Sequence, residues 1–164
     1  MSKRINVSEL EPVIGTLYPS PFDQTSRARE RTKLGDQEGL TQLGVNFLRL
    51  PPGVWSGQRH WHTLSDEFFY VLAGEVVLVT DEGEEIFHAG DAAGFKAGDP
   101  DGHSFQNRSD ADVLMLEIGT RNDEDVGQYP DIDLVARMDG VPAFYTHKDG
   151  TPYLDIRRRG PKDD

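Results

Sequence analysis

The stretch RHWHTLSDEFFYVLAGE, residues 59–75, joins a polar segment to a nearly apolar run. Side chains alternate between the two faces of a β-strand, so His60 and His62 point the same way, with Cα atoms about 7 Å apart. The short TLSD connection brings Glu67, the first residue of the apolar run, back beside them. Two imidazoles and one carboxylate are typical of a divalent transition-metal site that keeps coordination positions open.

An alternative explanation is a pair of surface histidines near a surface acid, and these three residues alone favour it. A second segment, GDAAGFKAGDPDGHSFQN (90–107), changes the balance, because His103 opens a later strand there. In a closed barrel, this third imidazole could meet the first two. The two remaining histidines lie in turn-like segments and are not expected to be ligands: His88 and His147.

Length and composition limit the class of protein. A chain of 164 residues indicates one domain with a real core, and 17 Gly and 10 Pro indicate many turns. The absence of cysteine excludes disulfides and thiolate ligands, so any metal must use nitrogen and oxygen ligands. The formal charge of −12 disfavours nucleic acid as a partner. The N-terminus lacks the apolar run of a signal peptide, and no segment has the length of a membrane span; we expect a cytoplasmic protein without membrane contacts.

The central part of the chain reads as a series of short strands separated by turn signals. Asp81-Glu82-Gly83 marks the turn of a hairpin within residues 75–91. A spacing of about ten residues per strand, with few segments of helical period, predicts an all-β sandwich or barrel. The other runs expected to be strands are LGVNFLRL (43–50), EFFYVLAG (67–74), AAGFKAG (92–98), HSFQN (103–107) and ADVLMLEIG (111–119).

We expect three regions in this single domain. Residues 1–39 are polar and weakly periodic, and form an N-terminal arm that lies on the core. Residues 40–120 form the barrel core, and residues 121–164 form a C-terminal extension that packs on the barrel, with its last residues disordered. Within the extension, residues 129–138 predict a short strand or helical turn, and residues 144–156 a final hairpin. No internal repeat is present, which predicts one barrel rather than two.

The two histidine segments resemble the paired sequence signature of the cupin superfamily. The first signature consists of a glycine, HxH, three or four residues, Glu, six residues and Gly. The chain matches it with HWH (60–62), Glu67 and Gly74. The departure is small: Gly53 leaves six residues before the first histidine, where five are usual.

The second signature consists of a glycine, five residues, Pro, any residue, Gly, a short gap, His, three residues and Asn. Gly90, Gly98, His103 and Asn107 fit it. Lys96 stands where the proline is usual, which is expected to alter the rim of the pocket. The gap before the histidine is four residues rather than two, a variation that leaves the assignment of His103 intact.

This resemblance implies a fold and a metal site. The fold is an all-β single cupin barrel, that is, a double-stranded β-helix or jelly roll. The implied ligands of the metal are His60, His62, Glu67 and His103. The ion is one divalent transition metal, and this donor set accepts Mn, Fe, Ni, Cu or Zn.

Strand parity extends the prediction to the pocket around the metal. Phe69 and Val71 share the face of Glu67, and Phe105 and Asn107 share the face of His103. These four residues are expected to line an apolar pocket with a few polar groups, the usual form of a small-molecule site. Asn107 either fixes the tautomer of a ligand histidine or serves the barrel structure.

The function remains divided between two classes. The flanking segments YPSPF, RTKLGD, YPDIDL and THKDGTPY resemble bacterial single-domain cupins of uncertain function, some of them labelled sugar-phosphate isomerase-like. The first class is a metal-dependent enzyme that isomerises, oxygenates, decarboxylates or eliminates from a small oxygenated molecule. The second is a non-catalytic small-molecule binder or sensor; a DNA-binding regulator is disfavoured because no helix-turn-helix segment is evident. The sequence indicates no catalytic acid or base.

The arm also predicts an assembly. Residues 1–39 bury little on their own, yet LYPSPF and GLTQLGV carry apolar side chains that must dock somewhere. Docking on the sheet of a second subunit would cover an exposed strand edge. We therefore expect a homodimer, the commonest soluble oligomer; the alternative is that the arm packs on its own barrel.

Overall fold

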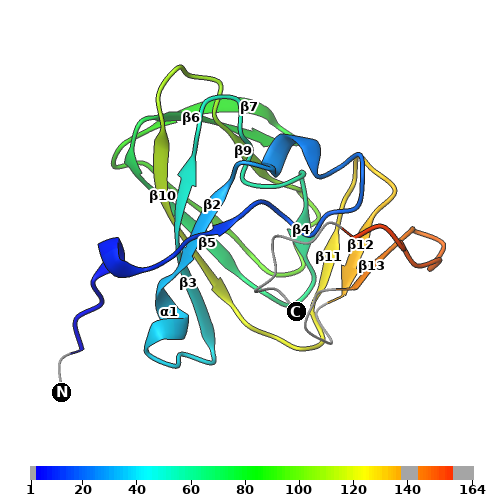
Figure 1. Cartoon of the computed structure of the whole chain (residues 1–164). Helices are drawn as coiled ribbons and strands as arrows, with labels where there is room; N and C mark the ends of the chain where they lie inside the picture. The colour runs from blue at the N-terminus through cyan, green and yellow to red at the C-terminus, as the bar shows by residue number, and fades with distance from the viewer. Residues whose placement is uncertain (1–2, 138–143, 157–164) are drawn as a thin grey trace.

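The computed structural model describes residues 3–137 and 144–156 of the chain, which form a jelly roll (Figure 1). A six-stranded antiparallel sheet has the order β1-β2-β3-β10-β5-β8, and a three-stranded sheet has the order β7-β6-β9. A four-stranded sheet, β13-β12-β11-β4, lies at one side of the barrel. The predicted all-β jelly-roll fold is confirmed.

The first two sheets contain the strands of the barrel proper. Their bounds are β1 Val13–Ile14, β2 Glu30–Lys33, β3 Leu43–Leu50, β5 Glu67–Ala73, β6 Glu75–Thr80, β7 Gly83–His88, β8 Ala92–Phe95, β9 Ser104–Gln106 and β10 Val113–Thr120. The third sheet contains β4 Trp61–His62, β11 Val126–Gln128, β12 Val135–Arg137 and β13 Phe144–Thr146. The described helical segments are short: α1 Leu34–Gln37 and the 3-10 turns η1 Val7–Glu9 and η2 Gln24–Ser26. None of them has the length and apolar character that a membrane crossing requires.

Alternation along the strands separates the core from the surface. Along β5, Phe69 and Val71 are buried, whereas Phe68, Tyr70 and Leu72 are exposed. The buried side chains of the two barrel sheets meet in one core: Leu48, Leu50, Val54, Phe69, Val71, Val76, Leu78, Phe87, Phe105, Val113 and Met115. The burial of these side chains from water is the main favourable term that holds the two sheets together.

The arm packs on the barrel of its own chain. β2 pairs with β3, with Thr32 opposite Phe47, and so covers that sheet edge. A second core forms where the arm meets the extension, and its buried members are Tyr18, Tyr129, Leu134, Ala136 and Tyr145. The run 129–138 contributes strand β12 rather than a helical turn. The expected disorder at the end of the extension concerns residues 157–164, which lie outside the described residues.

The turn between β5 and β6 explains the last glycine of the first signature. Gly74 has φ of 86°, in the left-handed region. A Cβ atom on this residue would lie 2.6 Å from the carbonyl oxygen of Asp112. Only glycine combines that φ with so close an approach of a neighbouring backbone.

Candidate metal centre

The predicted ligands come from three separate elements at one end of the barrel. His62 belongs to β4, and Glu67 is the first residue of β5. His60 pairs with His103 through an isolated antiparallel bridge, in which each backbone N–H donates to the carbonyl of the other residue. The short strand pairing therefore brings together imidazoles that are more than 40 positions apart in the chain. We refer to His60, His62, Glu67 and His103 as the histidine–glutamate cluster.

One carboxylate oxygen lies at the centre of this cluster. Glu67 Oε2 is 2.9 Å from Nε2 of His103, 3.4 Å from Nε2 of His62 and 3.7 Å from Nε2 of His60. Donor atoms bound to a common ion at about 2.1 Å lie about 3.0–3.4 Å apart in octahedral or tetrahedral geometry. The ligand atoms of His60, His62 and Glu67 all lie within 4.8 Å of one another.

Hydrogen bonds from Nδ1, the ring nitrogen that faces away from Glu67, orient two of the imidazoles. Nδ1 of His60 lies 2.7 Å from the carbonyl oxygen of Gln58, so it carries the proton and donates to that oxygen. Nδ1 of His62 lies 2.5 Å from Oδ2 of Asp125, to which it donates in the same way. Both partners hold the proton on Nδ1 and turn Nε2 toward Glu67, so that Nε2 is the nitrogen available to a metal.

His103 is held differently. Its ring stacks on Phe95, with centroids 3.6 Å apart and planes 8° apart, and its side chain is almost fully buried. Although Nε2 of His103 and Oε2 of Glu67 are 2.9 Å apart, neither atom has a hydrogen-bond partner among the described residues, and neither has Nδ1 of His103. Buried polar atoms without partners are costly, and a shared cation would satisfy both groups at once.

The charges of the cluster are strongly coupled. Burial lowers the pKa of His60 to about 3, so this imidazole is neutral at physiological pH. Burial acts to raise the pKa of Glu67, but attraction from His62, the contact with His103 and attraction from His60 outweigh it and hold the pKa well below its usual range. For His62, burial acts to lower the pKa, yet the carboxylates of Glu67 and Asp125 raise it. An ionised carboxylate beside imidazoles is the protonation state that suits a cation.

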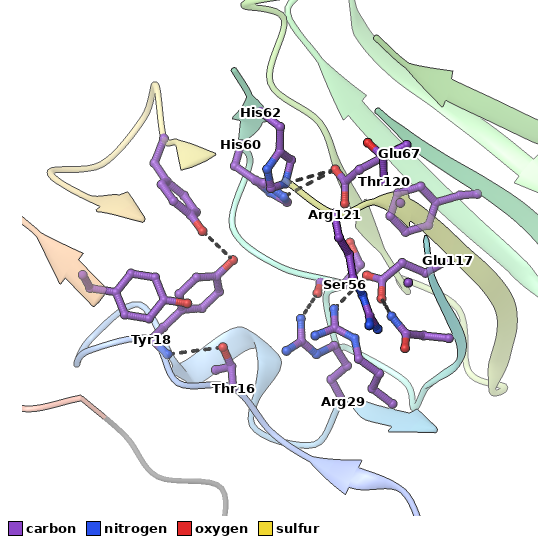
Figure 2. A pocket seen from close by; sticks show the side chains of 17 residues that line it. Thr16, Tyr18, Arg29, Ser56, His60, His62, Glu67, Glu117, Thr120 and Arg121 are labelled. Carbon is purple, nitrogen blue, oxygen red and sulfur yellow. Dashed lines mark hydrogen bonds and ion pairs between the residues drawn. The ribbon is translucent and has the colours of Figure 1, made fainter. Parts of the chain in front are cut away.

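The cluster opens into a cavity of about 250 Å³ at the barrel mouth (Figure 2). In Figure 2, His60, His62 and Glu67 lie across this cavity from Tyr18 and Arg29. The lining residues are Thr16, Tyr18, Arg29, Arg31, Gly44, Asn46, Ser56, His60, His62, Glu67, Phe69, Glu117, Gly119, Thr120, Arg121, Tyr129 and Tyr145. A cavity of this size suits a small molecule, since it lies below the range of about 300–1,000 Å³ that is usual for drug-sized ligands.

The expected pocket lining is only partly what the structure shows. Phe69 lines the cavity. Val71 and Phe105 lie instead in the buried core, because the barrel narrows below the cluster and its side chains fill the interior. Asn107 serves the barrel structure: its amide donates to the carbonyls of Leu50 and Ala111, both at 2.7 Å.

A second, smaller cavity of about 230 Å³ lies on the other side of the cluster. His62 and Glu67 line both cavities, and His103 lines the second. Lys96, which replaces the usual proline of the second signature, lines this second cavity together with Asp99. Lys96 therefore adds a positive charge to the second cavity and not to the main one.

Several cavity residues lie outside the two signatures. Arg29 and Arg31 come from the arm, and Tyr129 from the extension, where weak periodicity gives no sign of their position. Tyr129 stacks on His60, with ring centroids 5.4 Å apart, and its hydroxyl donates to that of Tyr18 at 3.3 Å. Burial raises the pKa of Tyr129 well above its usual value, so it stays a phenol and a hydrogen-bond donor.

The family model of the Cupin domain matches residues 46–119. A crystal structure from Silicibacter pomeroyi, described as a sugar phosphate isomerase from a cupin superfamily, is 40% identical. The match covers 93% of this chain and 98% of that chain, with a TM-score of 0.86. The chain belongs to the cupin superfamily.

Other cupins of known structure are less similar. A protein from Acidithiobacillus ferrooxidans, named as a candidate sugar phosphate isomerase, is 29% identical, with a TM-score of 0.69 over 80% of this chain and 82% of that one. A protein from Thermotoga maritima, named as a predicted oxalate decarboxylase, is 22% identical, with a TM-score of 0.57 over 73% of this cupin and 99% of that chain, and shares the fold alone. Among curated proteins, none matches the chain.

Proposed function

We propose that this cupin is a metal-dependent enzyme that isomerises a small sugar phosphate. The observation that carries the proposal is the convergence of three Nε2 atoms on Oε2 of Glu67 at the edge of an open cavity. A site that only stabilised the fold would be closed, whereas a catalytic metal site keeps positions open to the substrate. The 40% identity to a protein described as a sugar phosphate isomerase supports the choice of reaction.

The donor set fits a divalent transition metal. His60, His62, Glu67 and His103 offer three neutral nitrogens and one carboxylate oxygen, and unpartnered atoms of Glu67 and His103 face the same point. Such an ion, when bound, supplies Lewis-acid polarisation of the hydroxyl and carbonyl oxygens of a sugar. Its identity among Mn, Fe, Ni, Cu and Zn stays open, because the donors suit each of them.

The reaction needs no external oxidant or reductant. In aldose–ketose isomerisation, a proton leaves C2 and one is added at C1, while the hydroxyl proton moves from one oxygen to the other. For the oxygen part of this exchange the chain supplies a proton donor, since the phenol of Tyr129 lies against His60, lines the cavity and stays protonated. Tyr18 accepts from Tyr129 and positions its hydroxyl, and Gly57 makes room: a Cβ atom at Gly57 would lie 2.9 Å from Oη of Tyr18.

Metal analysis and a direct assay together test the proposal. Protein prepared without chelator should contain about one equivalent of a transition metal. It should also convert a member of a panel of tetrose, pentose and hexose phosphates, seen by NMR in D₂O as deuterium incorporation at C1 or C2. Chelator should abolish the exchange, and the added metal should restore it. A metal-loaded protein that binds a sugar phosphate of the panel but incorporates no deuterium into any of them would instead support the non-catalytic binder.

A further inference from the structure

The main cavity carries arginines that the histidine–glutamate cluster does not use. Three arginines and two glutamates line it, which leaves one net positive charge before any cation is added. The chain as a whole carries a formal charge of −12, so this cavity is a local exception. A cleft of one sign with low-dielectric walls concentrates ions of the opposite sign. The residues counted are Arg29, Arg31, Arg121, Glu67 and Glu117.

Arg31 lines the cavity and has a guanidinium donor without a hydrogen-bond partner among the described residues. Its Nη2 donates to Oε1 of Glu117 at 2.7 Å, while Asn46 donates to the other oxygen of Glu117 at 2.8 Å. Nε of Arg31 is buried, and no residue in the described part of the chain accepts a hydrogen bond from it. A guanidinium offers five N–H donors in a fork that matches a carboxylate or a phosphate. Glu117 therefore orients Arg31 without using up its donors.

The other two arginines fix the surroundings of Arg31. Arg29 is buried and donates to the main-chain carbonyls of Ser56 and Gly15, which ties the arm to the barrel and holds the positive charge in place. Arg121 contacts Asp36 at the mouth of the cavity, as an exposed ion pair. Both arginines line the cavity while they make these contacts.

The barrel mouth also leaves room for a ligand beside these arginines. Gly44 on β3 and Gly119 on β10 lie opposite each other and both line the cavity. A Cβ atom on Gly44 would meet Nε of Arg121 at 3.6 Å, an ordinary contact distance. A larger side chain at this position would therefore fill cavity space without a forced backbone shift.

We propose that Arg31, supported by the charges of Arg29 and Arg121, binds the anionic end of a small molecule whose other end faces the histidine–glutamate cluster. The anionic end is a phosphate or a carboxylate. This inference rests on the proposed function, because it assigns the chemical class of the ligand of the same cavity. The competing role of Arg31, a structural counter-ion of Glu117 alone, predicts different results in the experiment below.

The test is calorimetric titration of inorganic phosphate, and separately of acetate, into the full chain loaded with one equivalent of zinc. Arg31→Gln should weaken binding of the preferred anion at least about tenfold, which corresponds to about 1.4 kcal/mol. Glu117→Gln should tighten it by a similar factor, because it removes a competing negative charge and keeps a hydrogen-bond acceptor for Arg31. The anion that responds identifies the end group of the ligand.

Matched controls separate the cavity from the protein surface. Arg108 and Glu84 form an exposed ion pair that does not line the cavity, so Arg108→Gln and Glu84→Gln should leave both titrations unchanged. Because all variants keep the cluster, an anion held by zinc alone would bind to all of them equally. Three results would overturn the proposal. They are equal binding by all variants, loss of binding in both the Arg31 and Glu117 variants, and no binding of either anion.

Gly44→Leu is the second variant, in case Arg31→Gln does not fold. It leaves the Arg31–Glu117 pair intact and fills the cavity, so it should weaken anion binding at least about tenfold; unchanged binding places the anion elsewhere and refutes the subsite. Zinc content measured on the same samples keeps the two proposals distinguishable. A chain that takes up no zinc but shows the Arg31 and Glu117 effects refutes the metal-dependent function and retains the anion subsite.

Discussion

Nδ1 of His62 lies 2.5 Å from Oδ2 of Asp125, a residue 63 positions later in the chain. Asp125 is itself buried and fixed, since its Oδ1 accepts from the backbone N–H of Leu64 at 2.8 Å and from the hydroxyl of Thr63 at 3.2 Å. Burial acts to raise the pKa of Asp125, but the hydrogen bond from His62 and that from Leu64 hold it at about 2. The carboxylate thus stays ionised and fixes the tautomer of His62 from the side of the ring that faces away from Glu67.

Asp125→Asn should therefore lower metal affinity about 10–100-fold, the usual cost of losing such an outer partner. The change removes the negative charge and the preferred acceptor of the His62 Nδ1 proton. Competition with a chromogenic chelator measures the affinity. Asp123→Asn, an exposed neighbour, is the control and should change nothing. Equal affinities of the two variants would show that Asp125 only anchors the loop.

Loss of a direct ligand should have a larger effect on metal content. His62→Ala and His103→Ala should each reduce bound metal from about one equivalent to below about a tenth, because each removes one of four donors. His88→Ala removes an exposed imidazole paired with Glu75 and should bind normally. Elemental analysis after purification without chelator gives the answer. Undiminished metal in both ligand variants would contradict the assigned ligand set.

Metal removal should also lower thermal stability. A ligand that binds only the folded state at 100 times its dissociation constant contributes about 2.7 kcal/mol. For a chain of this length, that corresponds to a fall in Tm of about 5–10 °C after chelation. Differential scanning calorimetry with and without chelator measures it, and the His103→Ala variant, already without metal, should show no response to chelator.

The phenol beside His60 gives a prediction about catalysis. Tyr129→Phe keeps the stacked ring but removes the hydroxyl, so kcat should fall about 10²–10⁴-fold while metal content stays the same. Tyr70→Phe, on the exposed face of β5, is the matched control and should retain full activity. Unchanged kcat in Tyr129→Phe would remove this residue from the proton transfer and leave it a packing role.

The barrel and the grouping of His60, His62 and Glu67 were readable from the sequence because they depend on local patterns. Strand alternation correctly placed Phe69 and Val71 on one face of the strand, which is buried, and the hairpin turn before Gly83 pairs β6 with β7 as expected. The spacing of the histidines predicted that they share a face, and His60 and His62 have ring centroids 5.1 Å apart.

The rest of the cavity could not be read in this way. Arg31 and Tyr129 line it because the arm and the extension dock on the barrel, and Asp125 contacts His62 from the extension. No periodicity in those segments predicts these positions. Parity also overestimated the depth of the pocket. It gives the face of Phe105 correctly but not its level in the barrel, where side chains already fill the interior.

A stability prediction concerns the signature glycine. Gly74→Ala should destabilise the fold by more than about 3 kcal/mol, because it combines a positive φ with a Cβ atom 2.6 Å from a backbone oxygen. Gly39→Ala is the matched control: its φ is 69°, but nothing lies within 4 Å of the added Cβ atom. It should cost only about 1–2 kcal/mol. Urea unfolding of both variants isolates the clash from the backbone preference, and equal losses would rule the clash out.

The outer face of the six-stranded sheet supports the predicted homodimer by a different route from the arm. On β5, Phe68, Tyr70 and Leu72 are 42%, 38% and 41% exposed. Ile118 and Leu116 of β10 pair with Phe68 and Tyr70 and continue this uncharged surface. Exposed apolar patches on a soluble chain mark interaction sites. In a protein of net charge −12, an uncharged face is where a second copy can approach with the least repulsion.

We therefore propose a two-fold dimer through this face, with the arm packed on its own barrel as β2 is on β3. Light scattering at micromolar concentration should give a mass near twice 18.3 kDa. Tyr70→Glu should return it to the single-chain value, because each copy would then bury an unpaired carboxylate in the interface. Ile86→Glu, on an exposed strand of the other barrel sheet, should leave the dimer intact. A wild-type mass near 18.3 kDa, or a dimer that survives Tyr70→Glu, would show that this face is not the interface.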